Sequence, residues 1–274
     1  MKLATVRLAG RTAAVRIDED RAVEIEGAPD VGTLLSSADW RDRAARAAGP
    51  SHDRATLDYA PLVLGPDKIV CVGLNYRSHI AETGQSEPQF PTLFAKFRSA
   101  LIGAHDDIVL PGAVRQPDWE AELAVVIGAP ARHVGEREAR SVIAGFSVVN
   151  DVTARDWQHR TLQWLQGKTF ERSTPLGPWL VTTDEADGAS GAIRCTVNGR
   201  LVQDADISDL VFGPAALVSY VSTIVTMLPG DVIATGTPAG IGAARTPPEF
   251  LADGDVVTTS IEGVGECTNR CRLG

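Results

Sequence analysis

The most informative stretch of this chain is Asp118-Trp119-Glu120-Ala121-Glu122-Leu123-Ala124-Val125-Val126-Ile127. Its apolar second half, rich in β-branched residues, is typical of a buried strand. Side chains alternate between the two faces of a strand, so Glu120 and Glu122 point the same way. Two like charges on one face at the start of an apolar strand are unfavourable unless a cation or polar partners neutralise them.

A second apolar run leads to a third carboxylate. Phe146-Ser147-Val148-Val149-Asn150 precedes Asp151, which comes beside Glu120 and Glu122 if the two strands are neighbours. Three hard carboxylate oxygens suit Mg²⁺, Mn²⁺ or Ca²⁺ better than Zn²⁺, which prefers nitrogen and sulfur. The residues alone leave two interpretations open, a divalent-metal site or an acidic solvated surface, and the pattern by itself favours the surface.

Length and composition are those of an ordinary globular protein. The 274 residues, 44% hydrophobic and 22% charged, suffice for one large domain with a small appendage. No stretch approaches the ~18 apolar residues of a membrane helix and no signal-peptide pattern opens the sequence, so we expect a cytoplasmic protein. The net charge of −9 argues against nucleic acid or an anionic membrane as a partner. The 4 cysteines are too few and scattered for a disulfide framework.

Two parts are predicted along the chain, a small N-terminal α/β domain at residues 1–65 and a larger β-rich domain at residues 66–274. The boundary rests on the linker Pro61–Asp67, which is rich in Pro and Gly. The first part is predicted to contain a β-hairpin and a helix, at Leu3–Leu8, Thr12–Ile17 and Asp39–Ala48.

Beyond the linker, short β-branched runs alternate with Gly and Pro turns. This pattern predicts a β-rich α+β fold and not an alternating βαβ sheet. The predicted strands are Ile69–Val72, Ala121–Ile127, Ile143–Asn150, Ile193–Val197, Val232–Thr235 and Val256–Ile261. Asn198-Gly199 is a type I′ hairpin signal, because both residues tolerate the positive φ that such turns need. Pro214–Met227 is the clearest helix, with Pro near its start.

Further segments follow one another in a characteristic order. They are Gly73-Leu74-Asn75-Tyr76-Arg77-Ser78-His79-Ile80-Ala81-Glu82, Asn150-Asp151-Val152-Thr153-Ala154-Arg155-Asp156, Gly167-Lys168-Thr169-Phe170, Pro175-Leu176-Gly177-Pro178 and Thr235-Gly236-Thr237-Pro238-Ala239-Gly240. Together with Glu-x-Glu they resemble the fumarylacetoacetate hydrolase superfamily over roughly residues 66–272, in particular its acylpyruvase and fumarylpyruvate hydrolase members. The resemblance implies a mixed β-roll catalytic domain, usually in a homodimer, that acts on 2-oxo or β-diketo acids. Residues 1–60 carry no such motif.

The resemblance also implies that Glu120, Glu122 and Asp151 bind Mg²⁺ or Mn²⁺, with Ca²⁺ as an alternative occupant in crystals. Three protein carboxylates leave about half of an octahedral shell open for the carboxylate and keto oxygens of a 2-oxo acid. The ion then stabilises the charge of an enolate where that charge develops. Lys168 is expected to assist as a cation on the enolate or the substrate carboxylate.

His79 and Glu82 are three residues apart, which places them on one face of a short helix. The carboxylate orients the imidazole and stabilises its protonated form, which makes a water-activating dyad. For an isolated pair a surface ion pair is the better interpretation, whereas the resemblance favours the dyad. Because Gly73 and Gly84 flank the segment, it is also a candidate lid that orders when substrate binds.

Arg155 and Gln158 fall on one helical face beside the expected metal ligands. We predict that both bind the substrate carboxylate; an arginine paired with an acid for structural reasons is the alternative. Thr235, at the end of an apolar strand, would offer its hydroxyl and nearby backbone donors to a carboxylate. Lys96 and Arg98 are weaker candidates for a distal anionic group of the substrate.

The predicted function is hydrolysis of a carbon–carbon bond in an acylpyruvate-type 2-oxo acid, such as fumarylpyruvate. Decarboxylation of oxaloacetate, which forms the same enolate, and isomerisation of a hydroxymuconate-type diacid are the alternatives. The dyad favours hydrolysis, because only hydrolysis strictly needs an activated water. The chain lacks the Gly-x-Ser-x-Gly of serine hydrolases and the Gly-x-Gly-x-x-Gly of NAD enzymes. A metal-stabilised binding protein is the non-enzymatic alternative, and intact His79, Glu82 and Lys168 argue against it.

Overall fold

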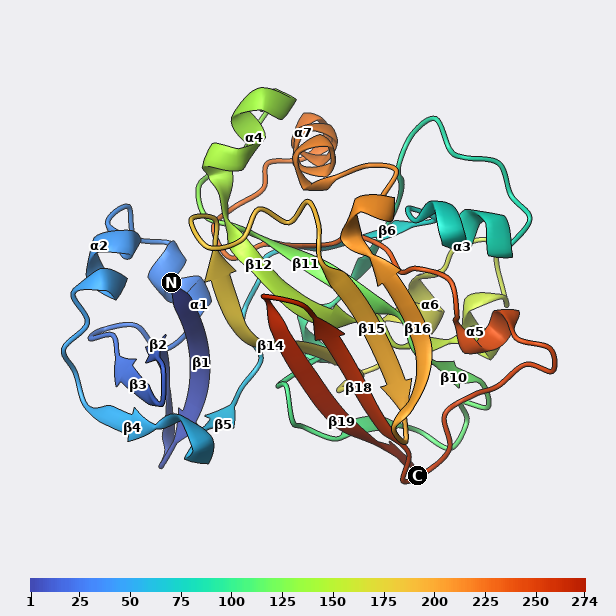
Figure 1. The fold of residues 1–274 in the computed structure, drawn as a ribbon, viewed down its shortest axis with the longest axis horizontal. Helices are drawn as coiled ribbons and strands as arrows, with labels where there is room; N and C mark the ends of the chain where they lie inside the picture. Colours follow the sequence, from blue (N-terminus) through green and yellow to red (C-terminus); the bar gives the residue numbers. More distant parts are fainter.

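A mixed sheet of 12 strands runs through the computed structural model, which describes residues 1–274 (Figure 1). From edge to edge its main path is β4 (Ser51–Asp53), β3 (Arg21–Glu24), β2 (Arg11–Asp18), β1 (Lys2–Leu8), β14 (Thr174–Thr182), β12 (Ile143–Asn150), β11 (Ala121–Ile127), β17 (Val232–Ala234), β6 (Ile69–Gly73) and β7 (Thr92–Lys96). Two short strands extend it, β5 (Asp58–Tyr59) beside β1 and β8 (Leu101–Ile102) beside β14. The β-rich α+β fold expected from the sequence is confirmed.

The strands of the first 65 residues continue this sheet. The predicted hairpin is present as β1 and β2, and β1 also pairs antiparallel with β14, opposing Lys2 to Val181 and Leu3 to Leu180. Two short helices, α1 (Val31–Leu35) and α2 (Trp40–Ala45), accompany these strands. The predicted helix at residues 39–48 is shorter than expected, because Arg46 leaves the helical conformation. The division of the chain at residue 65 stays a prediction.

A second sheet of 5 strands packs across the centre of the first (Figure 1). Its order is β16 (Arg200–Asp206), β15 (Ala192–Val197), β18 (Val256–Ile261), β19 (Gly265–Leu273) and β9 (Ile108–Leu110). The β15–β16 hairpin turns at Asn198 and Gly199, whose φ angles of 52° and 78° confirm the predicted turn residues.

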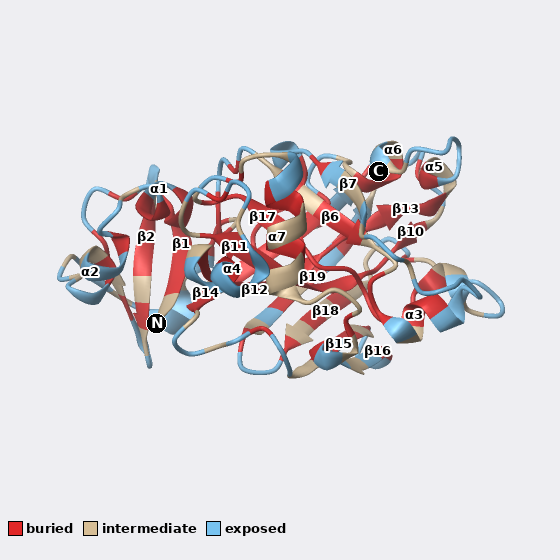
Figure 2. Ribbon diagram, turned by 90° about the horizontal axis from the view of Figure 1, so that it is seen from above, coloured by how far each residue is buried: buried red, intermediate tan, exposed pale blue.

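The alternation of side chains along β11 organises the interior. Leu123 and Val125 belong to the main hydrophobic core, together with side chains of the second sheet such as Ile193. Ala124 and Val126 belong to a second core on the opposite face of the strand. Figure 2 shows how fully the central strands are buried. Glu122 has the parity of Ala124 and Val126, so it points away from the main core.

The remaining elements are short. They are α3 (Arg77–Glu82), α4 (Glu136–Val142), α5 (Arg155–Gln158), α6 (Leu165–Lys168), α7 (Pro214–Ile224), the two-stranded sheet of β10 (Pro117–Asp118) and β13 (Thr153–Ala154), and the 3₁₀ turns η1 (Arg54–Thr56), η2 (Arg98–Ala100), η3 (Ile207–Asp209) and η4 (Gly242–Ala244). Helix α7 ends before the predicted Met227, because Val225 is extended and Met227 pairs with Ala131. No helix has the length and apolar character that crossing a membrane requires.

Candidate active site

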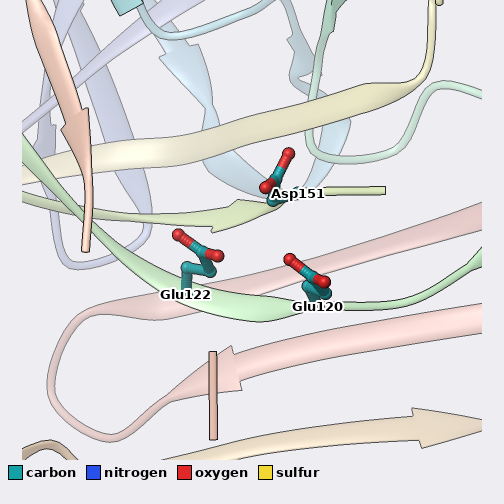
Figure 3. Close-up of side chains that lie close together, drawn as sticks. All are labelled: Glu120, Glu122 and Asp151. Carbon is teal, nitrogen blue, oxygen red and sulfur yellow. The ribbon is translucent and has the colours of Figure 1, made fainter. Parts of the chain in front are cut away.

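The pairing of β11 with β12 brings the three predicted carboxylates together. Asn150 opposes Ala121, so the next residue, Asp151, lies beside Glu120 and donates its backbone N–H to the Glu120 carbonyl at 2.9 Å. Carboxylate oxygens of Glu120, Glu122 and Asp151 all lie within 4.8 Å of one another, and Figure 3 shows the side chains facing a common centre. We refer to these three residues as the carboxylate cluster.

Burial sets the electrostatics of the carboxylate cluster. Glu120, Glu122 and Asp151 are only 5%, 1% and 0% exposed, so the solvated-surface interpretation is wrong. Burial, followed by the charges of Asp151 and Glu120, raises the pKa of Glu122 well above its usual range. The Gly236 N–H donates to Glu122 at 2.8 Å, but no ammonium or guanidinium group pairs with this carboxylate.

Two buried lysines neutralise the other members of the carboxylate cluster. The Lys168 ammonium, from α6, donates to Glu120 Oε2 and Asp151 Oδ2, both at 2.7 Å. Lys96 was a candidate for binding a distal anionic group, but its Nζ donates to Asp151 Oδ1 at 2.5 Å. Arg98, the other candidate, is exposed. Burial alone would raise the pKa of Asp151, but Lys168 and Lys96 outweigh it and lower that pKa to about 2.

Arg155 is engaged by protein groups in three directions. Its Nε donates to Asp118 at 2.8 Å, its Nη2 lies 2.6 Å from Glu120 Oε1, and its Nη1 donates to the Gln158 side-chain oxygen at 3.0 Å. The structure therefore shows that Arg155 pairs with acids, one of them a member of the carboxylate cluster, and its binding of a substrate carboxylate stays a prediction. Gln158 uses only its oxygen here, so its amide N–H₂ remains a donor toward a bound molecule.

Asp118 is a site residue to which the sequence analysis gave no role. Its fully buried carboxylate accepts hydrogen bonds from Arg155 and from the backbone N–H groups of Trp119, Gly242 and Ala243, at 2.7–3.0 Å. Asp118 therefore links the arginine that contacts Glu120 to the 242–244 turn. Its acidic side chain is visible in the sequence, but its partners come from distant segments and leave no local signal.

The predicted dyad forms on α3, as expected for residues three apart on a helix. His79 Nδ1 lies 2.8 Å from Glu82 Oε2, and the other oxygen of Glu82 accepts the Gly240 N–H at 2.8 Å. Because a carboxylate accepts at Nδ1, we assign the ring proton to that nitrogen, which leaves Nε2 free to accept a proton.

Most of these groups line one cavity of about 370 Å³. The predicted residues in its lining are His79, Glu82, Glu120, Glu122, Arg155, Gln158 and Lys168. Asp151 and Thr235 are not among them. Asp151 is fully buried, and the Thr235 hydroxyl is buried without a hydrogen-bond partner, whereas Thr237, two residues later, lines the cavity. His159, Phe94 and Trp164 also line it, and no motif in the sequence marked them. A larger hollow, beside α2 in the N-terminal part, contains none of the site residues.

Comparison with known proteins identifies the family of this chain. Residues 68–272 match the family model described as fumarylacetoacetate (FAA) hydrolase C-terminal. The mitochondrial oxaloacetate tautomerase FAHD2A of Homo sapiens is 46% identical over 231 residues, which are 83% of this chain and 74% of that protein.

Two solved structures are similar over the whole chain. The fumarylacetoacetate hydrolase of Exiguobacterium antarcticum has a TM-score of 0.90 at 31% identity, covering 100% of both chains. The 2-hydroxyhepta-2,4-diene-1,7-dioate isomerase of Mycobacterium marinum has a TM-score of 0.82 at 32% identity, covering 100% of this chain and 98% of that one. The matched family range contains the carboxylate cluster, the dyad and Lys168, and this chain belongs to the fumarylacetoacetate hydrolase superfamily of enzymes.

Proposed function

We propose that this protein is a divalent-metal-dependent enzyme that transfers a proton between carbon and oxygen of a 2-oxo acid, that is, a keto–enol tautomerase. The observation that carries the proposal is that the His79–Glu82 pair lines the same cavity as Glu120 and Glu122 of the carboxylate cluster. The oxaloacetate tautomerase named among the relatives supports oxaloacetate as the first substrate to assay.

The residues present fit a divalent cation. Glu122 is a buried carboxylate without a cationic partner, beside two further carboxylates whose oxygens lie within 4.8 Å of one another. An all-oxygen set of this kind suits Mg²⁺ or Mn²⁺. Bound there, the ion would act as a Lewis acid on the oxygens of a 2-oxo acid.

The charges of the site favour an anionic substrate once a divalent cation is present. The site contains four buried carboxylates and three buried cations. The carboxylates belong to Asp118, Glu120, Glu122 and Asp151, and the cations are Lys96, Arg155 and Lys168. With all of these groups ionised the protein contributes one negative charge in excess, and a divalent cation reverses the sign. A carboxylate substrate is then attracted into a cavity whose low dielectric strengthens the interaction.

The protein's own groups account for the proton transfer. His79 Nε2 takes a proton from C3 of the keto acid; the C–H electron pair forms the C2=C3 double bond, and the carbonyl π electrons move to oxygen. The oxygen then takes a proton from solvent and the imidazolium releases its proton to solvent, so the enol has the same atoms as the keto form and His79 is restored. Glu82 accepts a hydrogen bond from Nδ1 and thereby orients the imidazole. Lys168 supplies positive charge beside the developing enolate.

Tautomerisation of oxaloacetate can be followed by the ultraviolet absorbance of the enol. We expect activity with Mg²⁺ or Mn²⁺, loss of that activity in EDTA, and recovery when metal is added back. His79→Gln should lower kcat by about 10²-fold or more, the usual contribution of a positioned acid–base group. Full activity in EDTA, or an unchanged kcat in His79→Gln, would overturn the proposal.

Hydrolysis of an acylpyruvate, the reaction expected from the sequence, is the second candidate. The same dyad that takes a proton from carbon would take one from water, and Glu82 is already fixed by Gly240 for that purpose. The two candidate reactions are distinguished by their products, since hydrolysis of an acylpyruvate releases pyruvate and tautomerisation does not. A panel of acylpyruvates, oxaloacetate and a hydroxymuconate-type diacid, assayed for pyruvate, carbon dioxide and enol, assigns the reaction.

Two expectations about context belong to the same proposal. We propose a homodimer, which light scattering coupled to gel filtration would test. A cytoplasmic location also stays a prediction, since the names of mammalian relatives place those proteins in mitochondria.

A further inference from the structure

The cations of the cavity are already paired with protein carboxylates. Among its lining residues the only lysine and arginine are Lys168 and Arg155. Lys168 binds Glu120 and Asp151, and Arg155 binds Asp118 and Glu120. A second charged group at the far end of a substrate would therefore meet no uncommitted lysine or arginine in this cavity.

Phe94 and Trp164 form an aromatic wall of the cavity beside Lys168. Phe94 on β7 and Trp164, next to α6, both line the cavity and pack edge to face with ring centroids 5.5 Å apart. Lys168 Nζ lies 5.0 Å from the Phe94 ring centroid, which places the aromatic wall next to the reacting end of the site. Val72 and Leu74 add apolar lining.

The backbone of β6 fixes where the Trp164 ring lies. A Cβ atom added at Gly73 would be 2.4 Å from Trp164 Cζ3, far inside van der Waals contact. The ring therefore occupies the space that any larger residue at position 73 would take. This close packing holds one side of the aromatic wall in place without a hydrogen bond from the indole.

We propose that the cavity accepts 2-oxo acids carrying an uncharged apolar or aromatic substituent at C3, and that the Phe94–Trp164 wall is the specificity determinant that receives this substituent. The inference rests on the proposed keto–enol chemistry and shifts its preferred substrate class from diacids such as oxaloacetate to 2-oxo acids with one carboxylate. With the 2-oxo acid end held at the carboxylate cluster, C3 and its substituent extend along the remaining lining. Aromatic faces attract apolar and planar groups, and a volume of about 370 Å³ is in the range of pockets for ligands larger than a four-carbon acid.

The test compares two substrates of the same type of reaction. Tautomerisation of phenylpyruvate and of oxaloacetate is measured with the Mn²⁺-loaded enzyme, and the ratio of their kcat/KM values is the readout. We expect Trp164→Gln and Phe94→Ala each to lower the phenylpyruvate-to-oxaloacetate ratio by about tenfold, the effect of losing an apolar contact in a specificity pocket. Trp164→Phe, which keeps an aromatic face, should retain most of the ratio.

Phe97→Ala is the matched control, since Phe97 follows the same strand, is 57% exposed and lies outside the cavity. Its ratio should equal that of the wild type. Gly73→Ala provides a second approach, because it displaces the Trp164 ring without changing its chemistry, and it should lower the ratio as Trp164→Gln does. Circular dichroism establishes that each variant is folded.

The outcomes separate this inference from the proposed function. An unchanged ratio in folded Trp164→Gln and Phe94→Ala, or turnover of oxaloacetate without turnover of phenylpyruvate by the wild type, would overturn the role of the aromatic wall alone. Absence of turnover for both acids would overturn the proposed function and the inference with it. The inference is supported if the wild-type enzyme prefers phenylpyruvate and the phenylpyruvate-to-oxaloacetate ratio falls in both Trp164→Gln and Phe94→Ala.

Discussion

Asp118 shows how one buried side chain can organise a site without touching its reacting end. It pairs with Arg155, which contacts Glu120, and it accepts the backbone N–H groups of Gly242 and Ala243. Each oxygen of Asp118 therefore accepts two donors. Groups that hold metal-binding side chains in this indirect way usually change affinity or activity by about 10–100-fold when they are removed.

Asp118→Asn places an amide N–H₂ where two N–H donors now point. We expect Mn²⁺ affinity to fall by about 10–100-fold in isothermal titration calorimetry, with a loss of about 3 kcal/mol or more in the free energy of unfolding. Asp204→Asn is the control, because its ion pair with Arg194 is exposed. Unchanged Mn²⁺ affinity in a folded Asp118→Asn protein would contradict the positioning role.

Glu122 offers a test in which the sign of the effect depends on the metal. In the metal-free protein this buried carboxylate is repelled by Glu120 and Asp151, so Glu122→Gln should raise Tm in EDTA by about 2 °C or more. The same change removes a metal ligand, so it should abolish the Tm increase that Mn²⁺ gives the wild type by binding the folded state. Thermal scans with EDTA and with Mn²⁺ measure both effects; an equal Mn²⁺-induced increase in the variant would contradict the ligand role.

At the scale of elements, β11 and β12 were predictable from their sequence. Both are largely apolar and rich in β-branched residues, and their register in the structure places Asp151 beside Glu120. The His79–Glu82 contact was also predictable, because residues three apart lie on one face of a helix. Thr235 and Thr237 have the same parity in an extended chain, so alternation could not tell which one lines the cavity. Lys96 and Asp118 could not be assigned either, because their partners depend on packing between distant segments.

Gly145 tests the packing of β12 against β14. A Cβ at this position would lie 2.1 Å from the Val181 carbonyl oxygen, so Gly145→Ala must displace backbone. We expect a loss of about 1–3 kcal/mol in the free energy of unfolding, measured by urea titration. Gly112→Ala is the control, since its nearest neighbours are 3.7 Å away. Equal stability of the two variants would show that β14 can shift without cost.

At the scale of the whole molecule, the N-terminal strands and the central sheet share a hydrophobic core. Leu3 and Leu34 from the first part belong to one cluster with Ala124, Val126 and Leu180 from the larger part. The sequence showed the hairpin of the first part but not its pairing with β14, because non-local pairing has no local periodic signal. Residues outside every family motif thus complete the hydrophobic core on the same face of β11 as Glu122.

Leu34→Ala tests this shared core. Leu34 is fully buried, so its truncation should cost about 2–5 kcal/mol in the free energy of unfolding and should lower the urea midpoints of circular dichroism and of activity together. Leu162→Ala, at a side chain that is 97% exposed, should leave the stability unchanged. If activity survived at urea concentrations where the N-terminal part had already unfolded, the two parts would be energetically independent.

The alternation along β11 has a consequence for how this enzyme can diverge. Core packing limits the side-chain volume at Leu123 and Val125, whereas the candidate metal site requires a carboxylate at Glu120 and Glu122. No position has to meet both requirements. Selection for a new substrate can therefore act on the cavity lining while the packing of the same strand is preserved. A library that varies Phe94 and Trp164 explores specificity without altering the main hydrophobic core, which contains neither residue.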